Sequence, residues 1–164
     1  MPIADTLLRL AEHDPPFFRP IWSRDILDEV KRTILKFGYT EVQASRRIHA
    51  MDEAFPEALV TGYETLIAAM QNDPKDRHVL AVAVRAGADC IVSDNIKHFQ
   101  REALRPFGLE CLTAQDFLLH QYHLDPDTFI AILKEQAKDT NRSLADLVVL
   151  LSKYTPKLAE LIKA

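Results

Sequence analysis

The sequence contains little glycine, little cysteine and no long apolar segment. Its four glycines disfavour glycine-rich phosphate-binding loops and all-β folds with many hairpins, because both need residues that tolerate positive φ angles. No segment reaches the roughly 18 consecutive apolar residues of a transmembrane helix, and the first residues lack the basic and apolar regions of a secretory signal peptide. We therefore expect a globular protein of the cytoplasm.

Cys90 and Cys111 are the two cysteines of the sequence. A fold held together by disulfides has more cysteines in a smaller chain. Both residues lie in short apolar runs that are typical of strands, so we expect them to be core thiols in a reducing compartment.

Basic residues are not in excess. The 20 lysines and arginines are outnumbered by 24 aspartates and glutamates, which gives a formal net charge of −4. This balance excludes a general basic coat for nucleic acid, whose affinity comes from an excess of Lys and Arg. It leaves open an enzyme that approaches nucleic acid through metal ions bound to carboxylates.

Apolar residues at helical spacing alternate with short strand-like runs in the first two thirds of the chain. N-cap residues and prolines mark where each helix begins. We expect helices to begin near residues 4, 23, 40, 61, 74, 100, 113, 125, 143 and 155, and short strands at 17–22, 88–93 and 109–112.

Alternating helices and strands predict an α/β core with parallel strands and right-handed crossovers. In such sheets, functional sites form beyond the carboxyl ends of the strands. The strongest predicted strand ends at Ser93, Asp94 and Asn95, so we expect chemistry there. After residue 114 the pattern is purely helical, which predicts a domain over 1–114 and a helical extension over 115–164.

Three groups of acidic or amide side chains fall near the predicted ends of helices and strands. They are Asp25, Asp28 and Glu29; Asp73 and Asp76; and Asp94 with Asn95. Carboxylates from several such ends can converge on one divalent metal ion. Each group also has a local explanation, as a solvated helix face, as an N-cap with an acidic first turn, or as a turn after a strand.

Residues 73–99 strongly resemble the second half of a PIN domain, the metal-dependent ribonuclease fold of VapC-type bacterial toxins. The family pattern is an acid, a helix with small residues, and a hydrophobic strand that ends in Thr/Ser-x-Asp before a basic residue and Phe. Residues 22–30 resemble the family's second motif, whose helix supplies a Glu. Residues 55–64 and the C-terminal helices also resemble toxin-like members. The resemblance implies a three-layer α/β/α fold with a short parallel sheet, followed by a C-terminal α-helical extension.

The resemblance implies that Glu29 and Asp76 are the second and third acids of the family. At the fourth position the chain has Asn95, and Asp94 lies one residue earlier. The implied catalytic residues are Glu29, Asp76 and Asp94, and these three with Asn95 are the implied ligands of Mg²⁺ or Mn²⁺. The family's first strand and its Asp are missing before the helix at 4–10. We expect either that the chain lacks its first residues or that this member has lost the acid.

The resemblance further implies a metal-dependent endoribonuclease with RNA as substrate, a small antitoxin protein as partner and a homodimer. Ser93, Lys97 and Arg46 are candidate contacts to RNA, although Arg46 also fits a solvated helix face. His78 and His98 lie near the acidic site, where either could face phosphate. The alternative is a catalytically impaired module that binds RNA or an antitoxin, because the first acid is missing.

Overall fold

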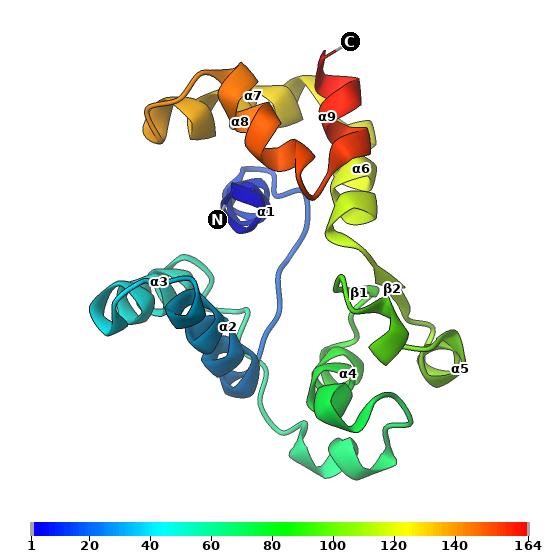
Figure 1. Ribbon diagram of the computed structural model, residues 1–164. Coiled ribbons are helices and arrows are strands. Elements are labelled where there is room, and N and C mark those ends of the chain that lie inside the picture. Colours follow the sequence, from blue (N-terminus) through cyan, green and yellow to red (C-terminus); the bar gives the residue numbers. More distant parts are fainter. Residues whose placement is uncertain (1, 164) are drawn as a thin grey trace. The chain divides into compact units, whose positions relative to one another are not determined.

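The computed structural model describes residues 2–163, which form nine α-helices, four 3₁₀ helices and two short strands within that range. The α-helices are α1 (Pro2–Glu12), α2 (Arg24–Lys36), α3 (Glu41–Ala54), α4 (Arg77–Ala86), α5 (Arg101–Leu104), α6 (Ala114–Leu124), α7 (Pro126–Asp139), α8 (Leu144–Ser152) and α9 (Pro156–Lys163) (Figure 1). The strands are β1 (Cys90–Val92) and β2 (Glu110–Leu112), and the 3₁₀ helices are η1 (Glu64–Ala69), η2 (Pro74–Asp76), η3 (Ile96–His98) and η4 (Arg105–Phe107).

Local capping determines where the helices begin. Ser23 accepts a hydrogen bond from Ile26 N at the start of α2. Thr40 and Ser143 form reciprocal capping boxes at α3 and α8. Gly87 ends α4 in the left-handed conformation (φ 65°), which costs a glycine little. These helix boundaries confirm the predictions made from cap residues.

The structure corrects two predicted elements. A helix was expected to begin near residue 61, and the structure has there the short 3₁₀ helix η1, Glu64–Ala69. Residues 17–22 were expected to form a strand, but only Trp22 pairs, in an isolated parallel bridge with Leu59. Pro20 lacks an N–H group and cannot extend that ladder toward the N-terminus.

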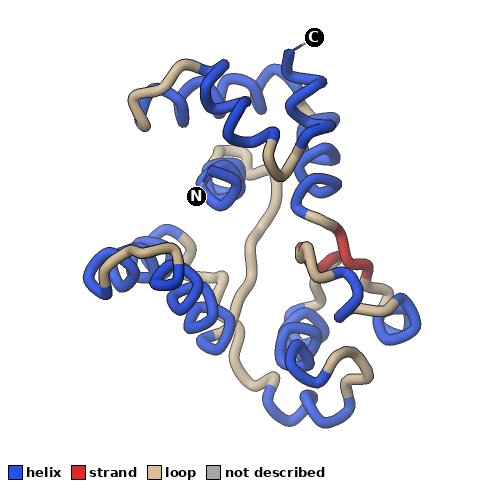
Figure 2. The backbone as a smooth tube through the Cα atoms, in the orientation of Figure 1, coloured by secondary structure: helices blue, strands red, loops and turns tan. Residues whose placement is uncertain are grey.

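β1 and β2 pair with each other in a short parallel sheet, and helices make up most of the remaining structure (Figure 2). This arrangement confirms the predicted α/β class. Cys90 and Cys111 do not form a disulfide with each other, and both are half-buried, whereas full burial in the core was expected. Burial raises the pKa of Cys90, and the neighbouring Glu110 and Asp89 add to the shift.

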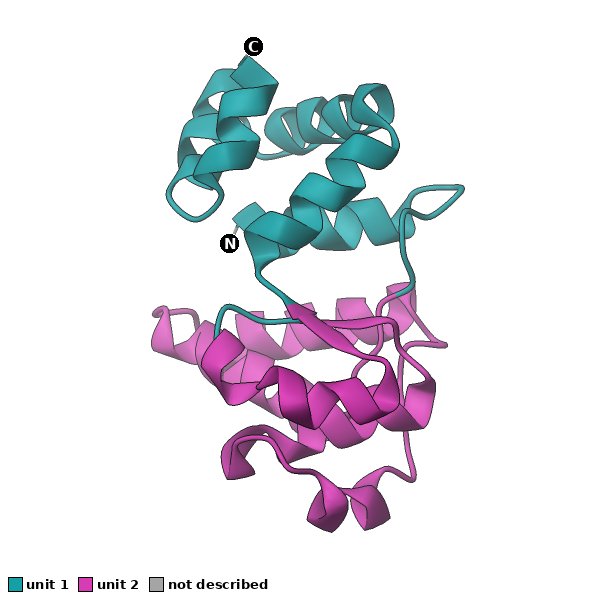
Figure 3. Cartoon of the chain, turned by 90° about the vertical axis from the view of Figure 1, so that its right-hand side faces the viewer, with its two compact units in different colours: residues 1–19, 92–95, 112–164 teal, residues 20–91, 96–111 magenta. Residues whose placement is uncertain are grey.

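The chain forms two compact units (Figure 3). The first comprises residues 1–19, 92–95 and 112–164, and the second comprises residues 20–91 and 96–111. The core of the second unit includes Leu80, Ile91 and Phe99. No helix within residues 2–163 is both long and apolar enough to cross a membrane.

The first unit joins α1 to the C-terminal helices. Leu10, Phe129 and Leu151 belong to its apolar core. Inside it, the Thr6 hydroxyl donates to Gln136 Oε1 at 2.7 Å. After residue 112 the chain thus returns to pack with its N-terminal helix α1. The domain boundary expected at residue 114 stays a prediction.

Candidate metal centre

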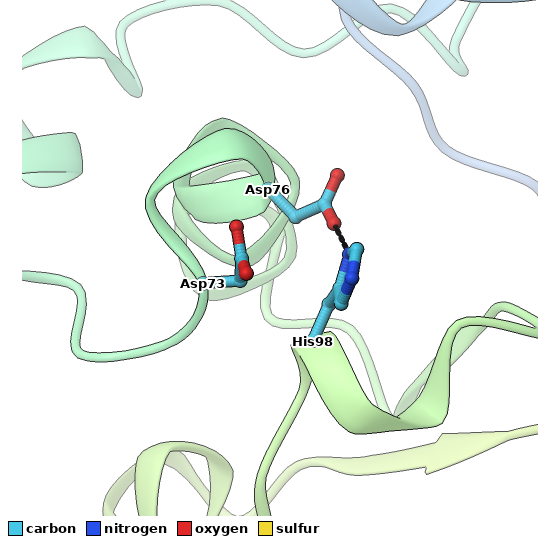
Figure 4. A group of neighbouring side chains, drawn as sticks. All are labelled: Asp73, Asp76 and His98. Atoms are coloured by element: carbon cyan, nitrogen blue, oxygen red, sulfur yellow. Dashed lines mark hydrogen bonds and ion pairs between the residues drawn. The ribbon is translucent and has the colours of Figure 1, made fainter.

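Asp73, Asp76 and His98 converge at the start of α4 (Figure 4). One ligand atom from each lies within 4.8 Å of the others. The closest pair is Nδ1 of His98 and Oδ2 of Asp76, which are 2.6 Å apart. All three residues are partly buried, so the cluster is neither fully enclosed nor fully exposed.

Backbone hydrogen bonds hold the cluster in place. Asp73 N donates to the carbonyl of His98 at 3.1 Å, which ties the turn after β1 to the start of η2. The Asp73 side chain accepts from Lys75 N at 3.0 Å, so it is also the N-cap of η2. Phe99 is 3% exposed and anchors the segment after η3 in the core. The three side chains therefore start from fixed backbone positions.

The donor set fits a divalent metal ion. Carboxylate oxygens suit Mg²⁺ and Mn²⁺, and an imidazole nitrogen suits transition ions. Because metal–ligand bonds are about 2.1 Å long, ligand atoms at these separations need only small rotations to share one ion. Asn72 is 3% exposed, and neither polar atom of its side chain has a partner among residues 2–163. A buried amide without partners leaves hydrogen-bonding capacity beside Asp73.

A pocket of about 690 Å³ lies along α2 and the start of α4. It is lined by Asp25, Asp28, Glu29, Lys31, Arg32, Leu35, Glu41, Lys75 and His78. Glu29 Oε1 lies 3.4 Å from Nε2 of His78 and 3.9 Å from the Arg32 guanidinium. The His78 contact is close enough for ionic attraction but is not aligned as a hydrogen bond. Glu29 is therefore held loosely, in a pocket that mixes acids and bases.

Asp25 has a firmer partner in the same pocket. The hydroxyl of Tyr63 donates to Asp25 Oδ2 at 2.7 Å. Tyr63 is only 4% exposed. Burial raises the pKa of Tyr63, and the bond to Asp25 adds to the shift while Ser23 opposes it. Asp25 is therefore held against the pocket wall.

The other predicted site residues are not members of the cluster of Asp73, Asp76 and His98. Asp94 Oδ1 accepts from Ala114 N at the start of α6 at 3.2 Å, and Asn95 N donates to Ser93 Oγ at 3.2 Å. These residues belong to the unit that contains α6, whereas Glu29 and Asp76 belong to the other. Lys97, in η3, and Arg46, on α3, are both exposed. The site roles of these residues stay predictions.

A sequence model of the PIN domain matches residues 4–97, more than half of the chain. The chain belongs to the PIN domain family. A "Putative ribonuclease VapC50" from Mycobacterium tuberculosis is 49% identical to the chain over 76 residues, which are 46% of this chain and 45% of that protein. The match thus spans less than half of that relative. No solved structure matches the chain.

Two residues of the PIN domain's candidate metal centre were not predicted as ligands from sequence. Asp73 was one of the candidate carboxylates but was favoured as an N-cap, which it is. His98 was considered as a contact to phosphate or as a surface histidine. Both could have been found from topology. A strand that follows a helix runs back past it, so residues after β1 return to the level where α4 begins. This places His98 near Asp76 despite a separation of 22 positions.

Proposed function

We propose that this PIN-family chain is a metal-dependent endoribonuclease of the VapC toxin type, which hydrolyses RNA phosphodiesters. The observation that carries the proposal is the convergence of Asp73, Asp76 and His98. The family match and the description of the VapC50 relative support it. A divalent ion bound there would supply Lewis acidity to the phosphodiester and lower the pKa of a coordinated water.

The side chains around the centre have separate roles in this proposal. Asp73 and Asp76 hold the ion, and His98 lies beside them, with its Nδ1 atom 2.6 Å from Asp76 Oδ2. Glu29, the second acid, takes a proton from the attacking water or provides a further ligand. Lys75 lines the same pocket as Glu29 and gives a positive contact for phosphate.

The remaining expectations are part of the proposal. Asp94 and Asn95 are secondary ligands of the Mg²⁺ or Mn²⁺ ion, and Ser93, Lys97 and Arg46 contact RNA. A small antitoxin protein blocks the site, and the active protein is a homodimer. Single substitutions of these five residues, measured in the RNA cleavage assay, test their roles. Sedimentation of the purified chain tests whether it is a dimer.

The decisive experiment compares the wild-type chain with Asp76→Asn. Purified protein is incubated with RNA and either Mg²⁺ or Mn²⁺, and the fragments are resolved by electrophoresis. We expect metal-dependent cleavage by the wild type and a loss of about 100-fold or more in Asp76→Asn. Asp127→Asn is the matched control because Asp127 is exposed on α7. Undiminished cleavage by Asp76→Asn, with circular dichroism showing both proteins folded, would refute the site assignment.

Asn95 favours a second candidate function, because it occupies the position of the family's fourth acid. In that case the chain binds RNA or an antitoxin and does not cleave RNA. The same incubation separates the two candidates. RNA that shifts in a native gel and stays intact in Mg²⁺ and Mn²⁺ supports the binding module, whereas fragments that require the metal support the nuclease.

A further inference from the structure

We propose that the centre formed by Asp73, Asp76 and His98 selects Mn²⁺ and related transition ions over Mg²⁺, because His98 supplies an imidazole nitrogen as a ligand. This inference rests on the proposed function for the presence of a metal ion. It goes further by assigning His98 to the ion itself and by naming the class of metal.

The position of the His98 ring is the first step of the argument. Its Nδ1 atom is 2.6 Å from Asp76 Oδ2. One of its ring nitrogens belongs to the group of ligand atoms that lie within 4.8 Å of one another. Figure 4 shows the ring directed toward the Asp76 carboxylate. The His98 carbonyl is bonded to Asp73 N and the next residue, Phe99, is buried. The backbone that carries the ring is therefore anchored beside Asp73.

The chemistry of the donor set is the second step. Mg²⁺ binds oxygen ligands almost exclusively and keeps several waters in a near-ideal octahedron. Mn²⁺ accepts the same carboxylates, and first-row transition ions also bind imidazole. Two carboxylates with one imidazole nitrogen thus offer Mg²⁺ only two of three protein ligands. They offer Mn²⁺ and its heavier neighbours all three.

A purely structural role for His98 makes a different prediction. If His98 only orients Asp76, as residues around metal sites commonly do for a ligand, the ion contacts oxygen alone. Replacing His98 would then weaken all divalent ions together and would leave the ratio of Mn²⁺ to Mg²⁺ affinity unchanged. Direct nitrogen ligation changes that ratio and places a nitrogen nucleus next to the ion.

Competition between ions tests the ratio without any RNA. Bound Mn²⁺ is measured by electron paramagnetic resonance while Mg²⁺ is added to wild type, His98→Asp and the control His49→Asn, which changes an exposed histidine on α3. We expect half-displacement of Mn²⁺ from the wild type and the control to need at least about ten times more Mg²⁺ than from His98→Asp. Equal displacement within about twofold would overturn the inference.

Nitrogen hyperfine coupling tests the ligand directly and needs no variant. Electron spin echo modulation of Mn²⁺ bound to the wild type is expected to show a coordinated ¹⁴N, replaced by ¹⁵N when only histidine is labelled. The coupling should disappear in His98→Asn and persist in His49→Asn. A wild-type spectrum without nitrogen coupling, or a wild type that binds no Mn²⁺, refutes the inference. Coupling without RNA cleavage supports the metal centre and refutes the proposed nuclease, so the two failures are distinguishable.

Discussion

The carboxylate of Asp76 and the imidazole of His98 meet at 2.6 Å although 22 positions separate them in the chain. Asp76 precedes α4, and His98 ends the 3₁₀ turn that follows β1. Both side chains are about three quarters buried. A contact of this length between a carboxylate and an imidazole is a strong hydrogen bond when either group is charged. It joins the two segments that frame the candidate metal centre.

Asp73→Asn should separate the two roles of Asp73. Asparagine caps helices about as well as aspartate, so we expect the melting temperature without metal to change by about 2 °C or less. The loss of one anionic ligand should weaken Mn²⁺ binding by about tenfold or more. Melting curves with and without Mn²⁺ measure both effects, because an ion that binds only the folded state raises the melting temperature. Equal Mn²⁺ stabilisation of variant and wild type would exclude Asp73 as a ligand.

Glu29→Gln should reduce RNA cleavage much more than it reduces stability. The Glu29 side chain is 44% exposed, and its contacts to His78 and Arg32 are long. Exposed ion pairs of this kind contribute little, so we expect a loss of about 0.5 kcal/mol or less in the free energy of unfolding. Cleavage should fall by about 100-fold if Glu29 acts on the attacking water. Urea unfolding and initial cleavage rates give the two numbers, and a rate within about twofold of wild type would remove Glu29 from the proposed machinery.

Most helix boundaries could be predicted because they depend on a few adjacent residues. Ser23, Thr113 and Ser143 each accept a hydrogen bond from a backbone N–H three positions later. A serine or threonine just before an apolar helical pattern can be recognised as such a cap from the sequence. The 3₁₀ form of residues 64–69 was not predicted. Its apolar spacing is also compatible with an α-helix, and its contact with α4 joins segments whose pairing the local spacing does not give.

The candidate site was only partly predictable for the same physical reason. Asp76 was found because it belongs to a continuous motif. His98 contributes through a contact across 22 positions, and sequence spacing alone does not give the direction of its ring. The contact of Asp94 could not be predicted for a similar reason. Its hydrogen bond from Ala114 N follows the pairing of β1 with β2, which joins segments about 20 positions apart. Contacts between distant segments can be predicted only when the fold is known.

Asp146→Asn should destabilise the chain at neutral pH and lose this effect in acid. Hydrogen bonds from the Ser143 side chain and backbone lower the pKa of Asp146. The unfolded state therefore binds more protons than the folded state near the ordinary carboxyl pKa. The stabilisation of the folded state by the Asp146 carboxylate is thus present above about pH 4, and it is lost as the pH falls through the folded-state pKa of Asp146. Urea unfolding at pH 7 and pH 3 measures the change in the difference between variant and wild type.

Ser143→Ala gives a check on that assignment. It removes the hydroxyl that caps α8 and should cost about 1 kcal/mol at pH 7. In a double-mutant cycle with Asp146→Asn, the two effects should be coupled at pH 7, and the coupling should shrink as the pH falls toward the lowered pKa of Asp146 and the carboxylate gains a proton. Additive effects at pH 7 would contradict the capping-box explanation.

Tyr63→Phe should destabilise the chain and also change its response to alkaline pH. The variant loses the 2.7 Å bond to Asp25, and because Asp25 is exposed and regains water, we expect a cost of about 1 kcal/mol at pH 7. Burial, aided by Asp25, raises the pKa of Tyr63. The unfolded state therefore loses this proton first, and wild-type stability falls as pH rises above about 10. Tyr63→Phe lacks this group, so its unfolding free energy should fall less steeply between pH 9 and pH 11, as measured by urea titration. Parallel slopes for the two proteins would show that Tyr63 does not control alkaline stability.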